Sequence, residues 1–86
     1  MTDSLRGLAV GQTLDARGLQ GPAGYHQAVA RLETMAEEEV LELYLDEGEP
    51  LRTVPFALRA EGHEILVSEP ARQGVRLLVR KRAPVG

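Results

Sequence analysis

The sequence predicts an α+β fold, a two-layer α/β sandwich in which two helices cover one face of a four-stranded mixed sheet. The predicted elements follow the order β-α-β-α-β-β along 86 residues. The strand segments alternate apolar and polar residues, which is typical of strands buried on one face only. A right-handed β-α-β crossover places the first helix on that apolar face, and the second helix must cover the same face.

Two segments form the predicted first β-α unit. Residues 1–11 lack a sustained period, and we expect them to form a loosely ordered leader. A strand follows over Thr13 to Ala16. From Pro22 to Ala36 the apolar residues recur at i, i+3, i+4 and i+7, which predicts an amphipathic helix. Proline suits the first helical position, and Gly21 then falls at or beside the N-cap. The acidic run Glu37–Glu39 predicts a solvated turn after the helix.

The middle of the chain supplies a second strand and a second helix. Val40 to Asp46 alternates, with Leu43 facing the core and Glu42 on the opposite face of a half-buried strand. Residues 47–50 read as a turn, and a helix follows from about Leu51 to Ala60. Pro55 fits that helix only within the first turn or so, because proline has no backbone N–H to donate.

The sequence pattern in the last third of the domain predicts a β-hairpin. One strand covers His63 to Glu69, with Ile65 and Val67 on the same face. The partner strand covers Val75 to Lys81. Residues 83–86 are expected to be a tail, so the folded domain is predicted to span residues 12–82.

Composition narrows the functional classes. The charged fraction of 27% and hydrophobic fraction of 43% describe an ordinary folded domain. A net charge of −3 argues against nucleic acid as a primary partner, because contacts to phosphates supply most of that affinity. The absence of cysteine excludes disulfides, zinc–thiolate sites and cysteine nucleophiles. No apolar run has the length of a membrane span, and no signal-peptide pattern is present, so we expect a cytoplasmic protein without a membrane partner.

A family resemblance begins in the segment Leu14–Gln20, which reads LDARGLQ and precedes Gly21 and Pro22. It resembles the opening of the TusA-like (SirA-like) sulfur-carrier proteins, which reads L-D-x-x-G-L-x-C-P-x-P. The resemblance extends over roughly residues 12–82 and implies a four-stranded mixed sheet under two helices. Gly21 stands where the family has its persulfide-bearing cysteine, and Gly24 stands where the family has a second proline.

The resemblance and the missing thiol together give the first functional hypothesis. A thiolate attacks and holds the sulfane sulfur, so this chain is expected to carry no sulfur. We therefore expect a non-catalytic protein-binding module rather than an enzyme, without metal or cofactor, and with sulfur-relay proteins as candidate partners. The resemblance assigns seven positions to partner or anion binding: Asp15, Arg17, Gly18, Gly21, Pro22, Gly24 and Asp46.

Two alternatives remain open at this point. The predicted fold resembles the C-terminal domain of translation initiation factor 3, and a basic strip closes the chain: Arg72, Arg76, Arg80, Lys81 and Arg82. A nucleic-acid-binding module is thus the second hypothesis, although aromatic residues for base stacking are scarce. The third is a small-anion-binding or enzymatic site at the start of the first helix, where backbone N–H groups and the helix dipole favour negative charge. Neither His26 nor His63 has a second ligand at metal-binding spacing.

Overall fold

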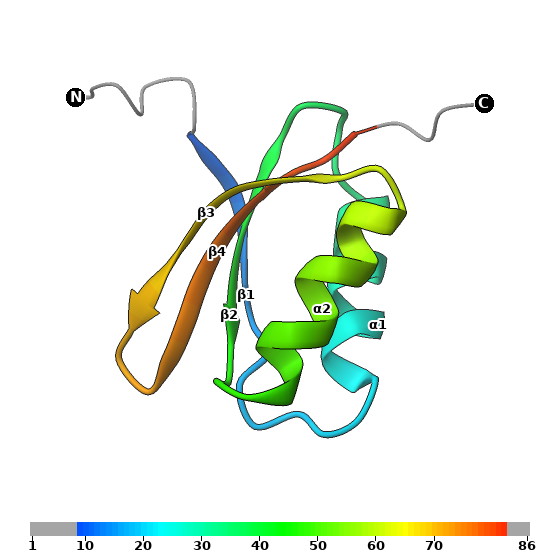
Figure 1. Ribbon diagram of the computed structural model, residues 1–86. Coiled ribbons are helices and arrows are strands. Elements are labelled where there is room, and N and C mark those ends of the chain that lie inside the picture. The colour runs from blue at the N-terminus through cyan, green and yellow to red at the C-terminus, as the bar shows by residue number, and fades with distance from the viewer. Residues whose placement is uncertain (1–8, 83–86) are drawn as a thin grey trace.

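The computed structural model describes residues 9–82, and they form a two-layer sandwich (Figure 1). The elements in chain order are β1 (Val10–Asp15), α1 (Ala23–Glu33), β2 (Val40–Leu45), α2 (Glu49–Ala60), β3 (Glu64–Ala71) and β4 (Gly74–Arg80). The predicted tail and most of the predicted leader lie outside the described residues.

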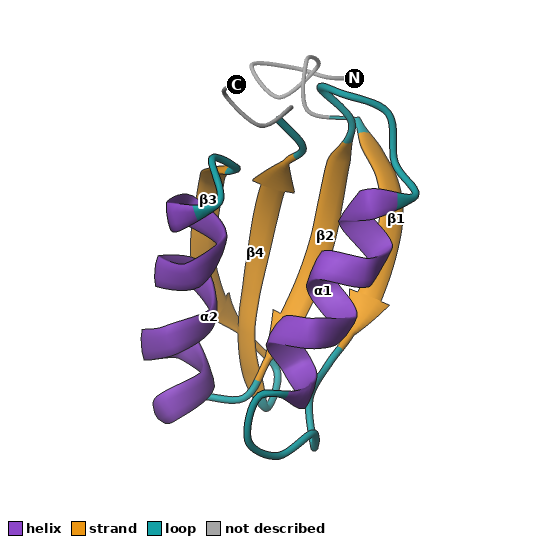
Figure 2. Ribbon diagram, turned by 90° about the vertical axis from the view of Figure 1, so that its right-hand side faces the viewer, coloured by secondary structure: helices purple, strands orange, loops and turns teal. Residues whose placement is uncertain are grey.

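The sheet has the strand order β1-β2-β4-β3. β1 pairs with β2 in parallel, and β4 pairs in antiparallel fashion with both β2 and β3. Both helices lie on the same face of this mixed sheet, side by side across it (Figure 2). The predicted fold class is therefore confirmed. No helix within residues 9–82 has the length and apolar character that crossing a bilayer would require.

The core lies between the sheet and the helices and is aliphatic. The largest fully buried side chains in this core are Leu32, Leu41, Leu43, Leu45, Leu58, Leu77 and Val79, whereas Val40 is buried on the opposite face of the sheet. The alternation in β2 directs Leu41, Leu43 and Leu45 toward the helices, as predicted. Leu32 of α1 and Leu58 of α2 meet this layer from the other side.

Several element boundaries differ from the predicted ones. β1 begins at Val10, because its backbone pairs with Val40 at the start of β2. Two residues assigned to the leader are therefore part of the sheet. α1 ends at Glu33 rather than near Ala36, since the backbone N–H groups of the next two residues bond in i→i−3 fashion to carbonyls of the last turn.

α2 starts two residues earlier than predicted and continues through a proline. Pro50 lies in its first turn, where a missing N–H costs least. Pro55 is the seventh residue of the helix, whereas the sequence argument allows a proline only within the first turn or so. It is buried, so its ring packs in the interior and offsets part of the cost of the missing backbone donor.

A bulge in β3 overturns the predicted strand faces there. Ile65 pairs with Val79, but the next paired residue is Val67, which lies opposite Leu78. Directly paired residues point to the same face of a sheet. Val67 therefore shares the helix-free face with Leu78, whereas Ile65 packs against the core. The expectation that Ile65 and Val67 share a face is wrong.

Candidate functional site at the helix starts

The loop that joins β1 to α1 is held by an ion pair at its beginning. Asp15, the last residue of β1, accepts hydrogen bonds from the backbone N–H and from the guanidinium of Arg17 at 2.8–3.1 Å. These bonds lower the pKa of Asp15 to about 2. Arg17 also donates to the backbone carbonyl of Arg72 at 2.7 Å and lies over the ring of Tyr44, 5.0 Å from its centroid. The turn is thus tied to the β3–β4 hairpin.

Asp46 fixes the next residue of the same loop. Its carboxylate accepts a hydrogen bond from the backbone N–H of Gly18 at 2.8 Å. The carboxyl ends of parallel β1 and β2 lie at one edge of the sheet, which brings these two residues together across 28 positions of sequence. Gly18 has a φ of +86°, a region that glycine occupies without steric cost.

Gly21 and Pro22 form the entry into α1. Gly21 adopts a φ of +58°, and Pro22 is the N-cap residue, whose carbonyl accepts the N–H of His26 at 2.9 Å. The sequence predicts Pro22 as the first helical residue, but Pro22 lies one position earlier, at the N-cap. The backbone N–H of Ala23 donates a hydrogen bond to the carbonyl of Gln20 at 3.2 Å. The first turn therefore offers fewer unpaired N–H donors than expected.

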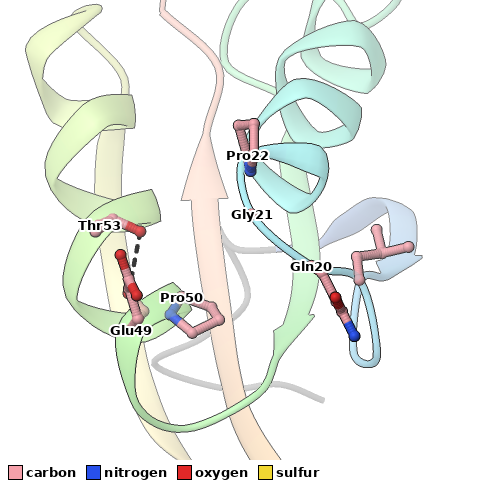
Figure 3. A pocket seen from close by; sticks show the side chains of 7 residues that line it. Gln20, Gly21, Pro22, Glu49, Pro50 and Thr53 are labelled. Atoms are coloured by element: carbon pink, nitrogen blue, oxygen red, sulfur yellow. Dashed lines mark hydrogen bonds between the residues drawn. The ribbon is translucent and has the colours of Figure 1, made fainter.

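An open groove of about 500 Å³ lies between the starts of α1 and α2 (Figure 3). Its lining consists of Leu19, Gln20, Gly21, Pro22, Glu49, Pro50 and Thr53. Glu49 brings a carboxylate to the groove, which disfavours a bound anion. The hydroxyl of Thr53 donates to the backbone carbonyl of Glu49 at 3.0 Å. The lining contains no thiol, imidazole or amine, and its polar side chains are those of Gln20, Glu49 and Thr53.

Gly24 occupies a different position from the other predicted site residues. It is buried, and an added Cβ would meet the side chains of Ala16 and Leu45 at 3.8 and 3.9 Å. It thus brings the first turn of α1 close to the sheet and does not line the groove. The structure gathers Asp15, Arg17 and Gly18 with Asp46 of the β2–α2 connection, places Gly21 and Pro22 on the groove, and puts Gly24 behind it.

The basic C-terminal strip is largely occupied by internal partners. Arg76 pairs with Glu42 and Glu69, and its bond lowers the pKa of Glu42. Arg80 and Arg82 both lie within 4 Å of carboxylates of Glu38 and Glu64. The Lys81 ammonium donates to two carbonyls at the end of α1. Internal pairing leaves little of this positive charge for phosphates, which weighs against the nucleic-acid hypothesis.

The two histidines have structural surroundings. Nδ1 of His63 accepts the backbone N–H of Arg82 at 3.2 Å. Burial lowers the pKa of His63, which favours the neutral acceptor form. His26 is exposed on α1. No group of three or more His, Asp or Glu side chains within residues 9–82 is arranged to hold a metal ion.

Sequence reasoning missed the α2 side of the groove. The sequence argument places Glu49 and Pro50 in a turn and gives Thr53 no functional role. The signal was present, since a proline directly after Glu49 is typical of a first helical turn. What the sequence does not reveal is that this second proline-bearing helix start faces the first across the groove.

The fold and the β1–α1 loop together define a small α+β domain with both helices on one face of a mixed sheet. The sulfurtransferase TusA family matches residues 12–81 of the chain. A protein of Archaeoglobus fulgidus named "Putative sulfur carrier protein" is 30% identical over 78 residues, which cover 90% of this chain and 89% of that protein. The chain therefore belongs to the TusA family, as its opening motif indicates, and it does so without any cysteine.

Proposed function

We propose that this chain is a protein-binding member of the TusA family that docks sulfur-relay proteins and carries no sulfur itself. The observation that carries the proposal is Gly21, which stands at the family's cysteine position by resemblance and lies on an open groove. An added Cβ there would meet no atom within 4 Å. The space for a reactive side chain exists, and the thiol does not.

The geometry of the loop supports a docking role. The Asp15–Arg17 pair and the Asp46–Gly18 bond hold the segment before Gly21 without help from a thiol. A surface that is preformed in this way avoids part of the ordering cost of association. We infer that the groove receives a loop of the partner, that the chain has no catalytic activity of its own, and that it acts in the cytoplasm.

Sulfur transfer gives the first test. The chain is incubated with a cysteine desulfurase and cysteine, and its intact mass is measured. We expect no gain of a sulfur atom, because a persulfide requires a thiol. A covalent sulfur adduct on the unaltered chain would contradict the proposal.

Gly21→Cys provides the complementary arm of this test. The side chain has room, although a φ of +58° costs a non-glycine residue about 1–2 kcal/mol. We expect the variant to accept sulfur from the desulfurase, whereas Gln27→Cys, on the exposed side of α1, does not. Equal labelling of both variants, or of neither, would show that the groove does not dock the donor.

Docking itself is tested by filling the groove. Gln20 is exposed and lines the groove, so Gln20→Arg is expected to fold normally and to weaken desulfurase binding about tenfold, as loss of a central contact does. Gln27→Arg adds the same charge on the exposed side of α1 and is the matched control. Binding measured by calorimetry that responds equally to both variants would contradict the assigned surface.

A further inference from the structure

The outward face of α2 carries a large exposed aromatic side chain. Val54, Pro55 and Leu58 of this helix are buried, and Phe56 projects on the opposite side with 72% of its surface exposed. Within residues 9–82, Val10 is the other large hydrophobic residue with substantial exposure. A lone exposed aromatic is ordinary on a protein surface, so the meaning of Phe56 depends on its neighbours.

Two arginines flank Phe56 on the helix surface. Arg52 precedes it by four residues and Arg59 follows it by three, which makes both of them neighbours on one helical face. Both are exposed, and neither forms an ion pair or a side-chain hydrogen bond with another residue of the described range 9–82. This face therefore concentrates positive charge in a chain whose net charge is −3.

The sheet side of the molecule shows the opposite pattern. Its arginines are held by carboxylates, as in the pairs of Arg76 with Glu42 and of Arg80 with Glu64. Thr53, three residues before Phe56, lies on the border of the 500 Å³ groove. The α2 face thus combines two guanidinium groups that form no ion pair within residues 9–82, an exposed ring and an adjoining hollow. Glu49 limits this positive region at the start of the helix.

We propose that Arg52, Phe56 and Arg59 form a docking surface for an acidic segment of a partner protein that carries an aromatic or aliphatic side chain beside its carboxylates. Arginine binds carboxylates through paired N–H donors, and aromatic residues with arginine dominate the energetics of protein interfaces. Phe56 contacts the apolar side chain of the segment, and the two guanidinium groups hold its acids. A phosphate backbone fits less well, because a single aromatic and two arginines offer few phosphate contacts.

The test selects peptides from a library of random short sequences displayed on phage, with the full chain as the immobilised target. We expect enrichment of sequences that combine Asp or Glu with Phe, Trp or Leu. Phe56→Ser and Arg59→Glu are expected to weaken the selected peptides about tenfold or more. Arg72→Glu makes the same charge change at an exposed arginine of the β3–β4 hairpin and is the matched control.

Each other result overturns the proposal: basic or uncharged selected peptides, no enrichment, equal loss in Arg72→Glu, or binding of a single-stranded oligonucleotide in place of acidic peptides. Phe56 is exposed, so its variant is expected to keep the melting temperature of the parent chain, which a thermal melt verifies. The surface goes beyond the proposed function and stands apart from sulfur transfer, since a failed desulfurase assay leaves the peptide result unchanged.

Discussion

Single residues show where a simple assignment of strand faces misleads. Glu42 lies on the helix-free face of β2, yet its side chain is only 16% exposed. It accepts hydrogen bonds from the side chains of Thr13, Tyr44 and Arg76. Glu42 lies on the face opposite Leu43, as predicted, but side chains from β1, β2 and β4 cover most of it.

Glu42→Gln is expected to destabilise the protein by about 1–2 kcal/mol at neutral pH, since Arg76 loses its charged acceptor. The Arg76 bond lowers the pKa of Glu42 in the folded state. A carboxyl with a lowered folded pKa stabilises above its unfolded pKa, and this stability is lost as pH falls through the folded pKa. The difference between parent and variant should therefore shrink below about pH 4.

Urea unfolding at neutral and at acid pH measures the free energy of unfolding of the parent and of Glu42→Gln, and so gives their difference at each pH. Glu47→Gln serves as the control, because Glu47 is exposed and should change stability by less than about 0.5 kcal/mol. A Glu42→Gln difference that stays constant with pH would mean that the ion pair does not contribute.

At the scale of elements, the end of α1 is stabilised from another part of the chain. Lys81, the single lysine of the sequence, donates from Nζ to the carbonyls of Leu32 and Met35 at 2.6 and 3.1 Å. Its backbone also bonds to Glu38 and Glu39 at 2.8 Å. A cation at a helix C-terminus satisfies unpaired carbonyls and opposes the helix dipole.

Lys81→Met retains most of the apolar stem and removes the charge. We expect a loss of about 1–2 kcal/mol, and faster amide hydrogen exchange in the last turn of α1. Arg59→Met, in the last turn of α2, is the matched control, because within residues 9–82 that guanidinium makes no ion pair. Equal losses in the two variants would show that the contacts of Lys81 add nothing to the general effect of charge.

The two edge strands each contain a bulge that their sequence patterns do not predict. β1 has a register shift between Val10 and Gln12, and β3 has one between Ile65 and Val67. Bulges at sheet edges twist the strand and interrupt its unpaired hydrogen-bonding row. Both edge strands of the sheet that residues 9–82 form are thus poor templates for a further strand.

At the scale of the whole molecule, the sheet buries apolar side chains on both of its faces and not only on the face that the helices cover. Leu78 is 3% exposed but lies outside the main core, paired with Glu42 on one side and Val67 on the other. Val40 is buried on the same face. Buried aliphatic side chains therefore also lie on the face without helices.

Leu78→Ala is expected to cost about 2–4 kcal/mol, in the same range as Leu43→Ala in the main core, because both changes empty a buried site. Phe56→Ala should cost less than about 0.5 kcal/mol, since its ring is exposed. Chemical denaturation of the three variants measures this. If Leu78→Ala behaves like Phe56→Ala, the burial of Leu78 on the face without helices does not stabilise the fold.

Local patterns in the sequence were sufficient for the element order, the fold class and the main core. Alternation in Val40–Leu45 and the helical period after Pro22 depend on residues a few positions apart, so each can be read without knowledge of the rest of the chain. The family motif around Gly18 and the absence of cysteine are likewise properties of the sequence alone. They define the class of the protein and exclude its thiol chemistry.

Tertiary structure decided the features that depend on partners distant in sequence. The bulge at Val67 follows from pairing with β4, the half-burial of Glu42 from Arg76, and the satisfied carbonyls at the end of α1 from Lys81. The groove exists because the start of α2 lies beside Gly21, although Glu49 follows Gly21 by 28 residues in the sequence. Such contacts arise only when the chain closes on itself, because no local period encodes which distant side chain will cover a given residue.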